Sequence, residues 1–179
     1  MRSLYQILLS AAVIIGLTCC NNSAEVKQAA EKRIFPEFHY AIDTIVKSSK
    51  GIIAGVELGE SRSAVMREQV ENAADQDKEG LVYEQKIDSA TKYSITYTFE
   101  NDSISEIEVL VNCENRDEGD AILADLRNYY RQKYTAPLMD KGFYVFNCFD
   151  SKKRNFKITL TDNGGTNNAV IDLLIYREK

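Results

Sequence analysis

A chain of 179 residues is long enough for one domain with a substantial core. Hydrophobic residues make up 44% of it and charged residues 27%, which is an ordinary globular composition. The 22 Lys and Arg residues are outnumbered by 27 Asp and Glu residues, and the net charge of −5 excludes the basic footprint of a nucleic-acid-binding protein.

The first twenty residues combine a positive start with an apolar run. Arg2 precedes an almost unbroken apolar stretch over 4–17, and a short polar stretch without stop-transfer charges follows it. Such a run is too short to span a bilayer comfortably and is typical of an export signal. Its end, Leu17-Thr18-Cys19-Cys20, resembles the lipobox of bacterial lipoproteins. In that family the signal is cut before a Cys, which is then acylated.

The resemblance favours Cys20 as the acylated residue, because Leu17 then stands three positions before it. Cys19 is the alternative, with Gly16 in the Leu position. Several acyl chains would tether the protein stably without a transmembrane helix. Asn21 rather than Asp after the Cys favours the outer membrane over the inner, with the domain facing the periplasm. A plain secretory signal or a buried N-terminal helix remains the other interpretation.

Three regions follow from this signal. We expect a lipoprotein signal peptide at 1–19, a tether and docking segment at 20–50, and a single α+β domain at 51–179. The stretch from Phe35 to Val46 is too apolar for a free linker, so we expect part of it to dock on the domain.

The first unit of the domain spans 51–114. Ser61 is a good N-cap, and the apolar spacing after it predicts a helix. A strand is expected over 81–87. Alternating residues over 93–99 turn through a polar segment into 104–113, which predicts an antiparallel hairpin.

The second unit, 115–179, repeats this plan. Acidic residues suit a helix N-terminus near Asp117, and helical spacing continues to Lys133, with Pro137 just beyond. Strands are expected over 143–149, 156–160 and 171–175. The order αβββ followed by αβββ predicts an α+β fold, in which an antiparallel sheet carries its helices on one face.

Two short motifs support this architecture by resemblance. The pattern Gly55-Val56-x-Leu58-Gly59-x-Ser61-x-x-x-Val65 resembles the opening of units in the β-lactamase-inhibitor-protein-like superfamily, which includes the SmpA/OmlA outer-membrane lipoproteins. Lys133-Tyr134-Thr135-Ala136-Pro137 resembles the helix-to-strand passage of such lipoproteins. The second unit lacks the glycine-rich opening. The resemblance implies the architecture and a general role in binding, and no functional residue.

Two cysteines remain beyond the lipobox pair. Cys113 and Cys148 each end a strand-like run, and an exported protein meets an oxidising compartment. We predict a structural disulfide between them, with two separately buried thiols as the alternative. Their wide separation and the lack of a CxxC motif argue against redox chemistry or a zinc site.

The strand at 143–149 is apolar on both faces, whereas a strand that a helix covers on one side should be polar on the other. We therefore expect an open sheet face around Tyr144 and Phe146 to bind something. The occupant is either a partner protein or the chain's own segment from Phe35 to Val46.

No residue pattern indicates catalysis, a metal or a cofactor. The single histidine, His39, stands between aromatic residues and is interpreted as packed or exposed at the surface. The acidic loop after Asn115 has Leu126 where a calcium loop needs a bidentate Glu. The basic cluster at 152–154 is interpreted as a solvated turn, with a phosphate or lipid-headgroup contact as the alternative.

Three sites, Thr44, Ser89 and Ser103, resemble the Asp-Ser/Thr-apolar O-glycosylation sequon of some Gram-negative lineages. Together the patterns predict a lipid-anchored periplasmic binding or scaffold protein of the cell envelope, without catalysis or a cofactor. Its expected partners are the membrane, through the acyl chains, and an envelope protein, but not nucleic acid. An envelope hydrolase with an unrecognised carboxylate site, or a small-ligand or lipid carrier, is the alternative.

Overall fold

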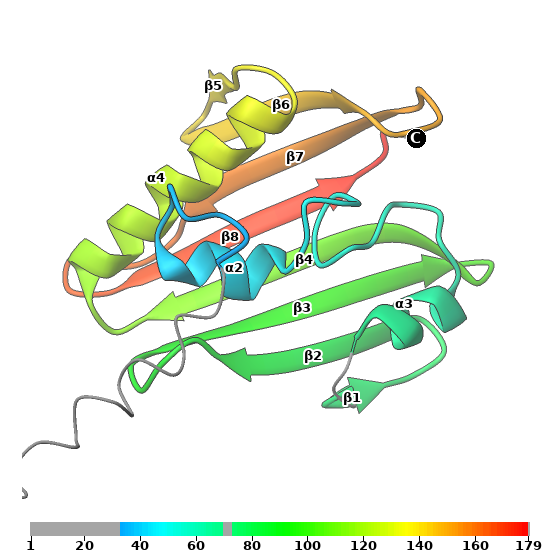
Figure 1. Ribbon diagram of the computed structural model, residues 1–179, viewed down its shortest axis with the longest axis horizontal. Coiled ribbons are helices and arrows are strands. Elements are labelled where there is room, and N and C mark those ends of the chain that lie inside the picture. The colour runs from blue at the N-terminus through cyan, green and yellow to red at the C-terminus, as the bar shows by residue number, and fades with distance from the viewer. Residues whose placement is uncertain (1–32, 70–72, 179) are drawn as a thin grey trace, which may run out of the picture. The chain divides into compact units, whose positions relative to one another are not determined.

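A computed structural model describes residues 33–69 and 73–178. Two short helices precede four strands, and one long helix precedes four more (Figure 1). The elements are α2 (Tyr40–Val46), α3 (Arg62–Glu68), β1 (Asp75–Gln76), β2 (Gly80–Lys86), β3 (Thr91–Glu100), β4 (Ser103–Cys113), α4 (Arg116–Lys133), β5 (Leu138–Asp140), β6 (Phe143–Phe149), β7 (Asn155–Asp162) and β8 (Ala169–Tyr176).

The strands form one antiparallel sheet in the order β1-β2-β3-β4-β8-β7-β6-β5. Two four-stranded meanders therefore meet where β4 pairs with β8, and α4 connects them. The α+β fold with an antiparallel sheet is confirmed, as is the hairpin of β3 and β4.

The structure adds a short outer strand to each predicted unit. β1 and β5 have two and three residues, too few to show an alternating pattern in the sequence. A two-residue turn, Lys141-Gly142, joins β5 to β6, and both residues have positive φ angles of 50° and 91°. This is the geometry of a tight type I′ hairpin, which glycine favours.

Alternation along the strands builds the core on one face of the sheet. In β3, Tyr93, Ile95 and Tyr97 are buried, while the residues between them are more exposed. The registers align such residues in a fully buried row that crosses five strands: Tyr97, Ile107, Ile175, Ile158 and Phe146.

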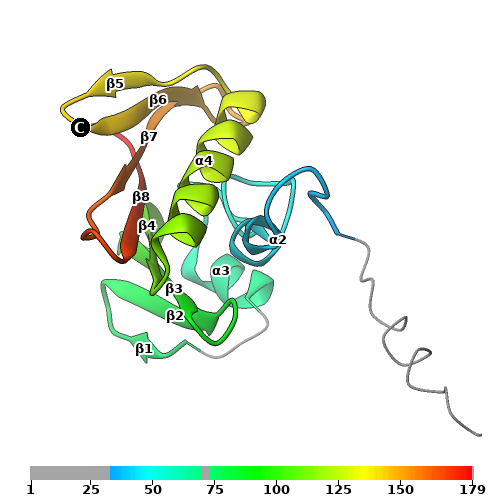
Figure 2. The ribbon, with the colours of Figure 1, turned by 90° about the vertical axis from the view of Figure 1, so that its left-hand side faces the viewer.

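Helix α4 covers this core. Asn115 caps its N-terminus by accepting hydrogen bonds from the amides of Asp117 and Glu118. Its buried face, which includes Ile122 and Leu126, packs on β4, β6, β7 and β8. Figure 2 shows α2 and α4 on the same side of the sheet.

Residues 33–50, the described part of the tether and docking segment, belong to the compact unit that begins at Arg33 and contains the sheet. Phe35 and Phe38 are buried, and α2 packs against α4 with Ile42, Ile45 and Val46 buried. The expected docking of this stretch is therefore present. In α3 the predicted cap at Ser61 is confirmed, since its side chain accepts from the amide of Ala64.

Candidate functional site

The predicted open face around Tyr144 and Phe146 is wrong, because α4 covers it. The register pairs Tyr144 with Leu160 and Phe146 with Ile158, which places both on the core face. Phe146 is fully buried, with its ring centre 6.1 Å from that of Tyr130 on α4. The hydroxyl of Tyr144 accepts a hydrogen bond of 3.1 Å from Arg127, whose guanidinium lies 5.1 Å from the Tyr144 ring centre.

The segment from Phe35 to Val46 does not occupy that strand either. The rings of Phe35 and Phe38 lie edge-on to Tyr129 of α4, with centres 5.2 and 6.2 Å apart. The segment thus packs on the helix, and the helix packs on the sheet. Self-packing is present, but its place was predicted incorrectly.

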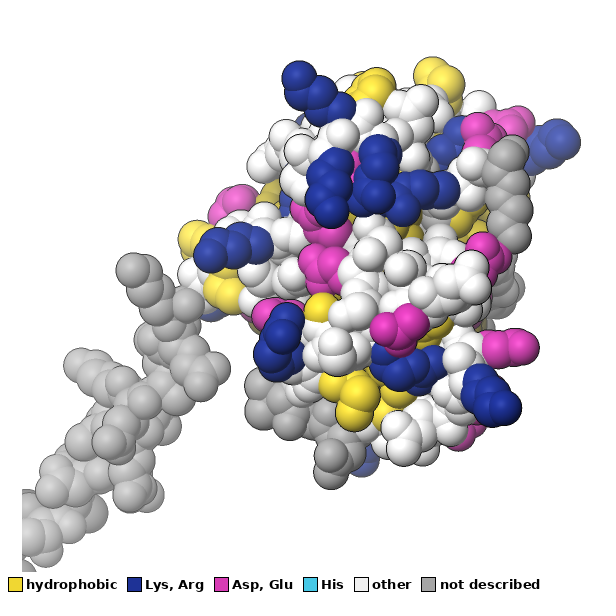
Figure 3. Space-filling view, turned by 90° about the vertical axis from the view of Figure 1, so that its right-hand side faces the viewer, with side chains coloured by type: hydrophobic (Ala, Val, Ile, Leu, Met, Phe, Trp, Pro, Cys, Tyr) yellow, Lys and Arg dark blue, Asp and Glu magenta, His cyan; other side chains and the backbone are white. Residues whose placement is uncertain are grey.

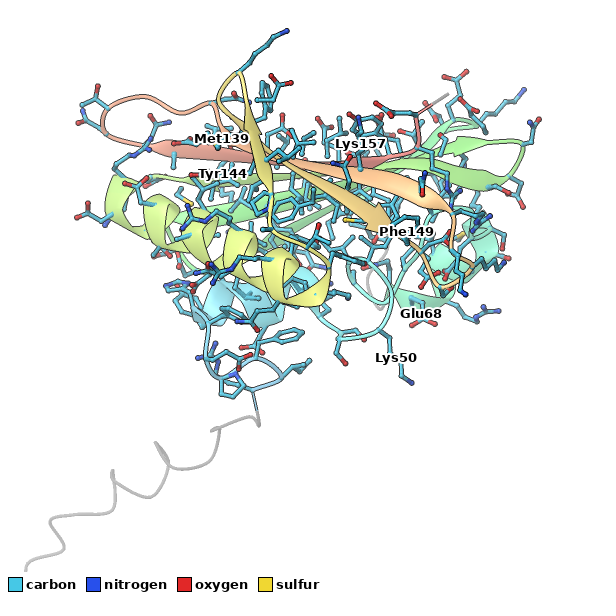
Figure 4. All side chains as sticks on the ribbon, turned by 90° about the horizontal axis from the view of Figure 1, so that it is seen from above. Lys50, Glu68, Met139, Tyr144, Phe149 and Lys157 are labelled. Carbon is cyan, nitrogen blue, oxygen red and sulfur yellow. The ribbon has the colours of Figure 1, made fainter. Side chains whose placement is uncertain are left out.

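The exposed apolar residues of this region lie at the outer edge of the sheet, on β5 and β6. Phe143 and Phe149 point to the uncovered face of β6 and are 41% and 64% exposed. Leu138 and Met139 of β5 are 64% and 63% exposed. We call these four residues the β5 edge. Figure 4 looks down on this end of the sheet, with Met139, Tyr144 and Phe149 labelled. Alternation in β6 was therefore recognised correctly, but the exposed face was assigned to the wrong residues.

The backbone of β5 also has a free side. Among the described residues β5 pairs with β6 alone, and Asp140 and Phe143 close the two-residue hairpin. Pairs in such a hairpin alternate between hydrogen-bonded and non-bonded, beginning with a bonded pair beside the turn. Met139 and Tyr144 form the next, non-bonded pair, so the N–H and C=O of Met139 point away from the sheet.

The opposite edge of the sheet has a different chemistry. β1 contributes Asp75 and Gln76, both exposed, to an edge that is polar and charged. Charged residues on edge strands discourage pairing with other chains. The two edges therefore differ: within the described part of the chain, the β5 edge combines outward-pointing backbone groups with apolar side chains, and the β1 edge does not.

The titratable candidates have structural roles or lie on the open sheet face. His39 caps α2: its Nδ1 accepts a hydrogen bond from the amide of Ala41 at 3.3 Å. The backbone amide of His39 donates to Asp125 at 2.5 Å.

Glu108 and Asp172 lie on the adjacent central strands β4 and β8. Burial raises the pKa of both carboxyls, and the charge of Asp172 adds to the shift at Glu108. Sequence reasoning missed this pair, because only the β4–β8 register brings the two together.

The described residues contain no group of three His, Cys, Asp or Glu side chains that could hold a metal ion.

The side chain of Lys133 is enclosed at the end of α4. Its ammonium donates to the carbonyls of Ser49 and Gly51 at 3.2 and 2.6 Å, and to the Tyr129 hydroxyl at 2.9 Å. Burial lowers its pKa to about 8. These contacts join α4 to the loop after α2.

The predicted disulfide is contradicted, because Cys113 and Cys148 are both free and buried. Strands β8 and β7 separate them, a distance of roughly 14 Å at normal strand spacing. They also lie at opposite ends of the sheet, since Cys113 pairs with Ala169 and Cys148 with Phe156. A disulfide needs Cα atoms within about 7 Å. Burial raises the thiol pKa to about 11 for Cys113 and about 12 for Cys148.

The three possible glycosylation sites lie in different surroundings. Ser89 in the β2–β3 turn and Ser103 at the start of β4 are exposed, whereas Thr44 is half-buried within α2. The predicted acylation residues, Cys20 and Cys19, lie outside the described residues.

Comparison with known proteins identifies no relative: no protein-family model, curated protein or solved structure matches the chain. Within residues 33–69 and 73–178, no helix has the length and apolar character needed to cross a membrane. The resemblance to the β-lactamase-inhibitor-protein-like superfamily therefore stays a prediction from short motifs.

Proposed function

We propose that this protein is a non-catalytic binding domain of the bacterial cell envelope, and that a partner protein adds an extended segment to its β5 edge. The observation that carries the proposal is the exposure of Leu138 and Met139 on the edge strand β5, beside the exposed Phe143 and Phe149 of its neighbour β6. Strand addition obtains affinity from main-chain hydrogen bonds and specificity from side-chain contacts.

The short length of β5 limits what the backbone alone can supply. Only Met139 offers both its backbone groups to a partner, so the apolar side chains have to contribute much of the affinity. Apolar contacts stabilise by roughly 25 cal/mol per Å² of buried surface. A partner segment with apolar residues at alternate positions fits this edge.

The proposed location follows from the lipobox resemblance. Acylation at Cys20, or at Cys19, would tether the domain to the outer membrane and leave it facing the periplasm. A tethered domain with an unprotected sheet edge is suited to hold an envelope protein beside the membrane. The proposed partners are this membrane, through the acyl chains, and an envelope protein.

The alternatives have less support in the described residues. A hydrolase with a carboxylate site needs paired acids in a deep pocket, whereas Glu108 and Asp172 lie on a sheet face. A lipid carrier needs a closed apolar cavity. The cavity of about 480 Å³ between β3, β4 and the end of β8 is lined mainly by polar and charged residues.

Site-specific photo-crosslinking in intact cells tests the proposal. Benzoylphenylalanine replaces Met139 in the full-length chain, and the matched control places it at Gln76 on the opposite sheet edge. We expect a discrete protein adduct from position 139 and none from position 76.

A second variant asks whether the backbone of β5 takes part. Met139→Pro removes the outward N–H while leaving the bonded pairs of β5 and β6 intact. With the crosslinker moved to position 138, we expect this substitution to abolish the adduct without changing the thermal unfolding midpoint. Equal adducts from both edges, or an adduct that persists in the proline variant, would contradict strand addition.

A further inference from the structure

The turn between β6 and β7 brings two guanidinium groups together around one buried carboxylate. The side chain of Asp150 is fully buried. Its Oδ2 accepts from Arg154 Nε at 2.7 Å and from Arg177 Nη2 at 2.8 Å, while its Oδ1 accepts from the amides of Lys152 and Arg154. The carboxylate therefore fixes the turn and both arginines.

A second acceptor, a backbone carbonyl, also binds both guanidinium groups. The carbonyl of Leu58 accepts from Arg177 Nη2 at 3.0 Å and from Arg154 Nη2 at 3.4 Å. Each arginine is thus held at two points, so its planar fork is oriented before any ligand arrives. Pre-organised donors of this kind bind anions at a low cost in side-chain entropy.

Gly59 leaves the space between the two forks open. A Cβ at this position would lie 3.4 Å from Arg177 Nη1 and 3.5 and 3.6 Å from the two terminal nitrogens of Arg154. The φ angle of Gly59 is +87°, which other residues rarely adopt. The backbone thus keeps a side chain out of the point where both arginines converge.

The forks retain unused donors. Arg154 makes its hydrogen bonds through Nε and Nη2, which leaves Nη1 beside Gly59. Arg177 Nε is buried, and no described residue accepts its hydrogen. A buried donor without a partner is unfavourable, so a ligand oxygen that reached it would be stabilised.

A cavity of about 480 Å³ opens at this point, with both arginines, Gly59, Ser103 and Ser105 in its lining. Its lining also includes the carboxylates of Glu100, Glu106 and Glu178, and Glu178 is paired with Lys157. The chain between 150 and 157 has four basic residues and one acidic residue. Figure 3 shows Lys and Arg side chains gathered on this side of the molecule.

We propose that Arg154 and Arg177 form a binding site for a phosphate group, either that of a free phosphomonoester or that of a phosphodiester headgroup. Two guanidinium groups that converge on one point offer several N–H donors, and the three oxygens and higher charge of a phosphate group can use more of them than a carboxylate can. Lys152 and Lys153 raise the local positive potential. The site is separate from the β5 edge and does not depend on the function proposed there.

The test observes the arginine Nε–H signals by nitrogen–proton NMR of the full-length chain in a phosphate-free, non-ionic detergent. The probes are inorganic phosphate and glycerophosphoglycerol, each compared with chloride at constant ionic strength. We expect saturable shifts of the Arg154 and Arg177 signals. Tighter binding of phosphate indicates a free ligand, and tighter binding of glycerophosphoglycerol indicates a headgroup; either result supports the site.

Two variants distinguish binding by the two guanidinium groups from the effect of general surface charge. Arg177→Lys keeps the positive charge but loses the fork, and we expect it to weaken binding at least about tenfold. The double variant Lys152→Gln and Lys153→Gln changes the charge but keeps the forks, and we expect a change of less than about threefold. If Arg177→Lys unfolds, Arg154→Lys replaces it.

The proposal is overturned if neither probe gives a saturable shift beyond that of chloride in the unmodified chain. It is also overturned if the double lysine variant loses binding while Arg177→Lys retains it. That result would assign the effect to diffuse electrostatics.

Discussion

At the scale of single residues, Asp150 determines the geometry of a whole turn. Its carboxylate is fully buried, yet it accepts hydrogen bonds from two backbone amides and two guanidinium groups. Burial alone would raise its pKa, but these hydrogen bonds and the Arg154 charge outweigh burial and lower the pKa below the ordinary value of 3.8. The charged form is therefore the one that the fold stabilises.

Replacing this carboxylate should destabilise the protein and change its acid sensitivity. Because the folded pKa lies below the unfolded one, the contribution of Asp150 is present above pH 3.8 and is lost as the pH falls through the folded pKa. We expect Asp150→Asn to lower the free energy of unfolding by about 3 kcal/mol at neutral pH, and by less in acid. Urea unfolding across the pH range measures this.

The matched control for that change is the exposed Asp75 of β1. Asp75→Asn should alter the free energy of unfolding by no more than about 0.5 kcal/mol at any pH. An equal effect of the two substitutions would contradict the role given to Asp150.

Gly119 shows a close approach between helix and strand. A Cβ at this position would lie 2.2 Å from the Cβ of Ala169, so the first turn of α4 can pack on β8 only with glycine here. Alanine would improve helix propensity by about 1 kcal/mol, but overpacking costs about 1–3 kcal/mol. We expect Gly119→Ala to be destabilising by chemical denaturation.

The rescue variant of this prediction is Gly119→Ala combined with Ala169→Gly. Removing the second Cβ frees the space, so the double variant should be more stable than the sum of the two single changes implies. Additive losses would show that the close approach is not the cause.

At the scale of elements, residues 33–50 act as a second layer over α4. This segment packs on the helix through aromatic contacts of Phe35 and Phe38 with Tyr129. Lys133 strengthens this packing by donating to two carbonyls of the following loop. The segment was expected to dock, but only the structure shows that its target is the helix.

Removing one aromatic ring of this layer should be costly. Phe35→Ala and Phe38→Ala each take away a buried ring, and we expect each to lower the free energy of unfolding by about 3 kcal/mol. The neighbour Ile34 is 50% exposed, so Ile34→Ala should cost less than about 0.5 kcal/mol. If all three variants have similar stability, the layer does not contribute to the fold as described.

At the scale of the whole molecule, the sheet is arranged symmetrically about the pairing of β4 with β8. Each half is a four-stranded meander that ends in a short outer strand. The two outer strands differ in chemistry, since β1 consists of Asp75 and Gln76, whereas β5 presents Leu138 and Met139 before Asp140. The symmetry of the backbone therefore does not extend to the surface, which is why we propose the β5 edge, and not the β1 edge, as the place where a partner binds.

The proposed membrane tether is tested on the whole protein in bacterial cells. Cys20→Ala should abolish acyl labelling and remove the chain from detergent-extracted membranes, because the acyl chains supply most of the membrane affinity. Cys19→Ala should retain both properties. The reverse result would move the acylated residue to Cys19, and unlabelled protein in the unmodified strain would contradict the lipoprotein prediction.

The sequence by itself determined the antiparallel α+β fold and the bounds of its longer elements, because alternation over 93–99 and helical spacing over 117–133 are local signals of burial. It also pointed to β6 as an unusual strand. It could not assign the faces of that strand, since the face toward α4 depends on pairing with β7 and on the helix above it.

Only the tertiary structure decided what lies together. Cys113 and Cys148 both lie near the ends of their strands, but the strand order puts two strands between them and the register places them toward opposite ends of those strands, which excludes their bond. Arg154 and Arg177 are far apart in sequence, and they meet because a buried carboxylate and the Leu58 carbonyl hold both. Contacts of this kind depend on long-range pairing, for which the chain has no local pattern.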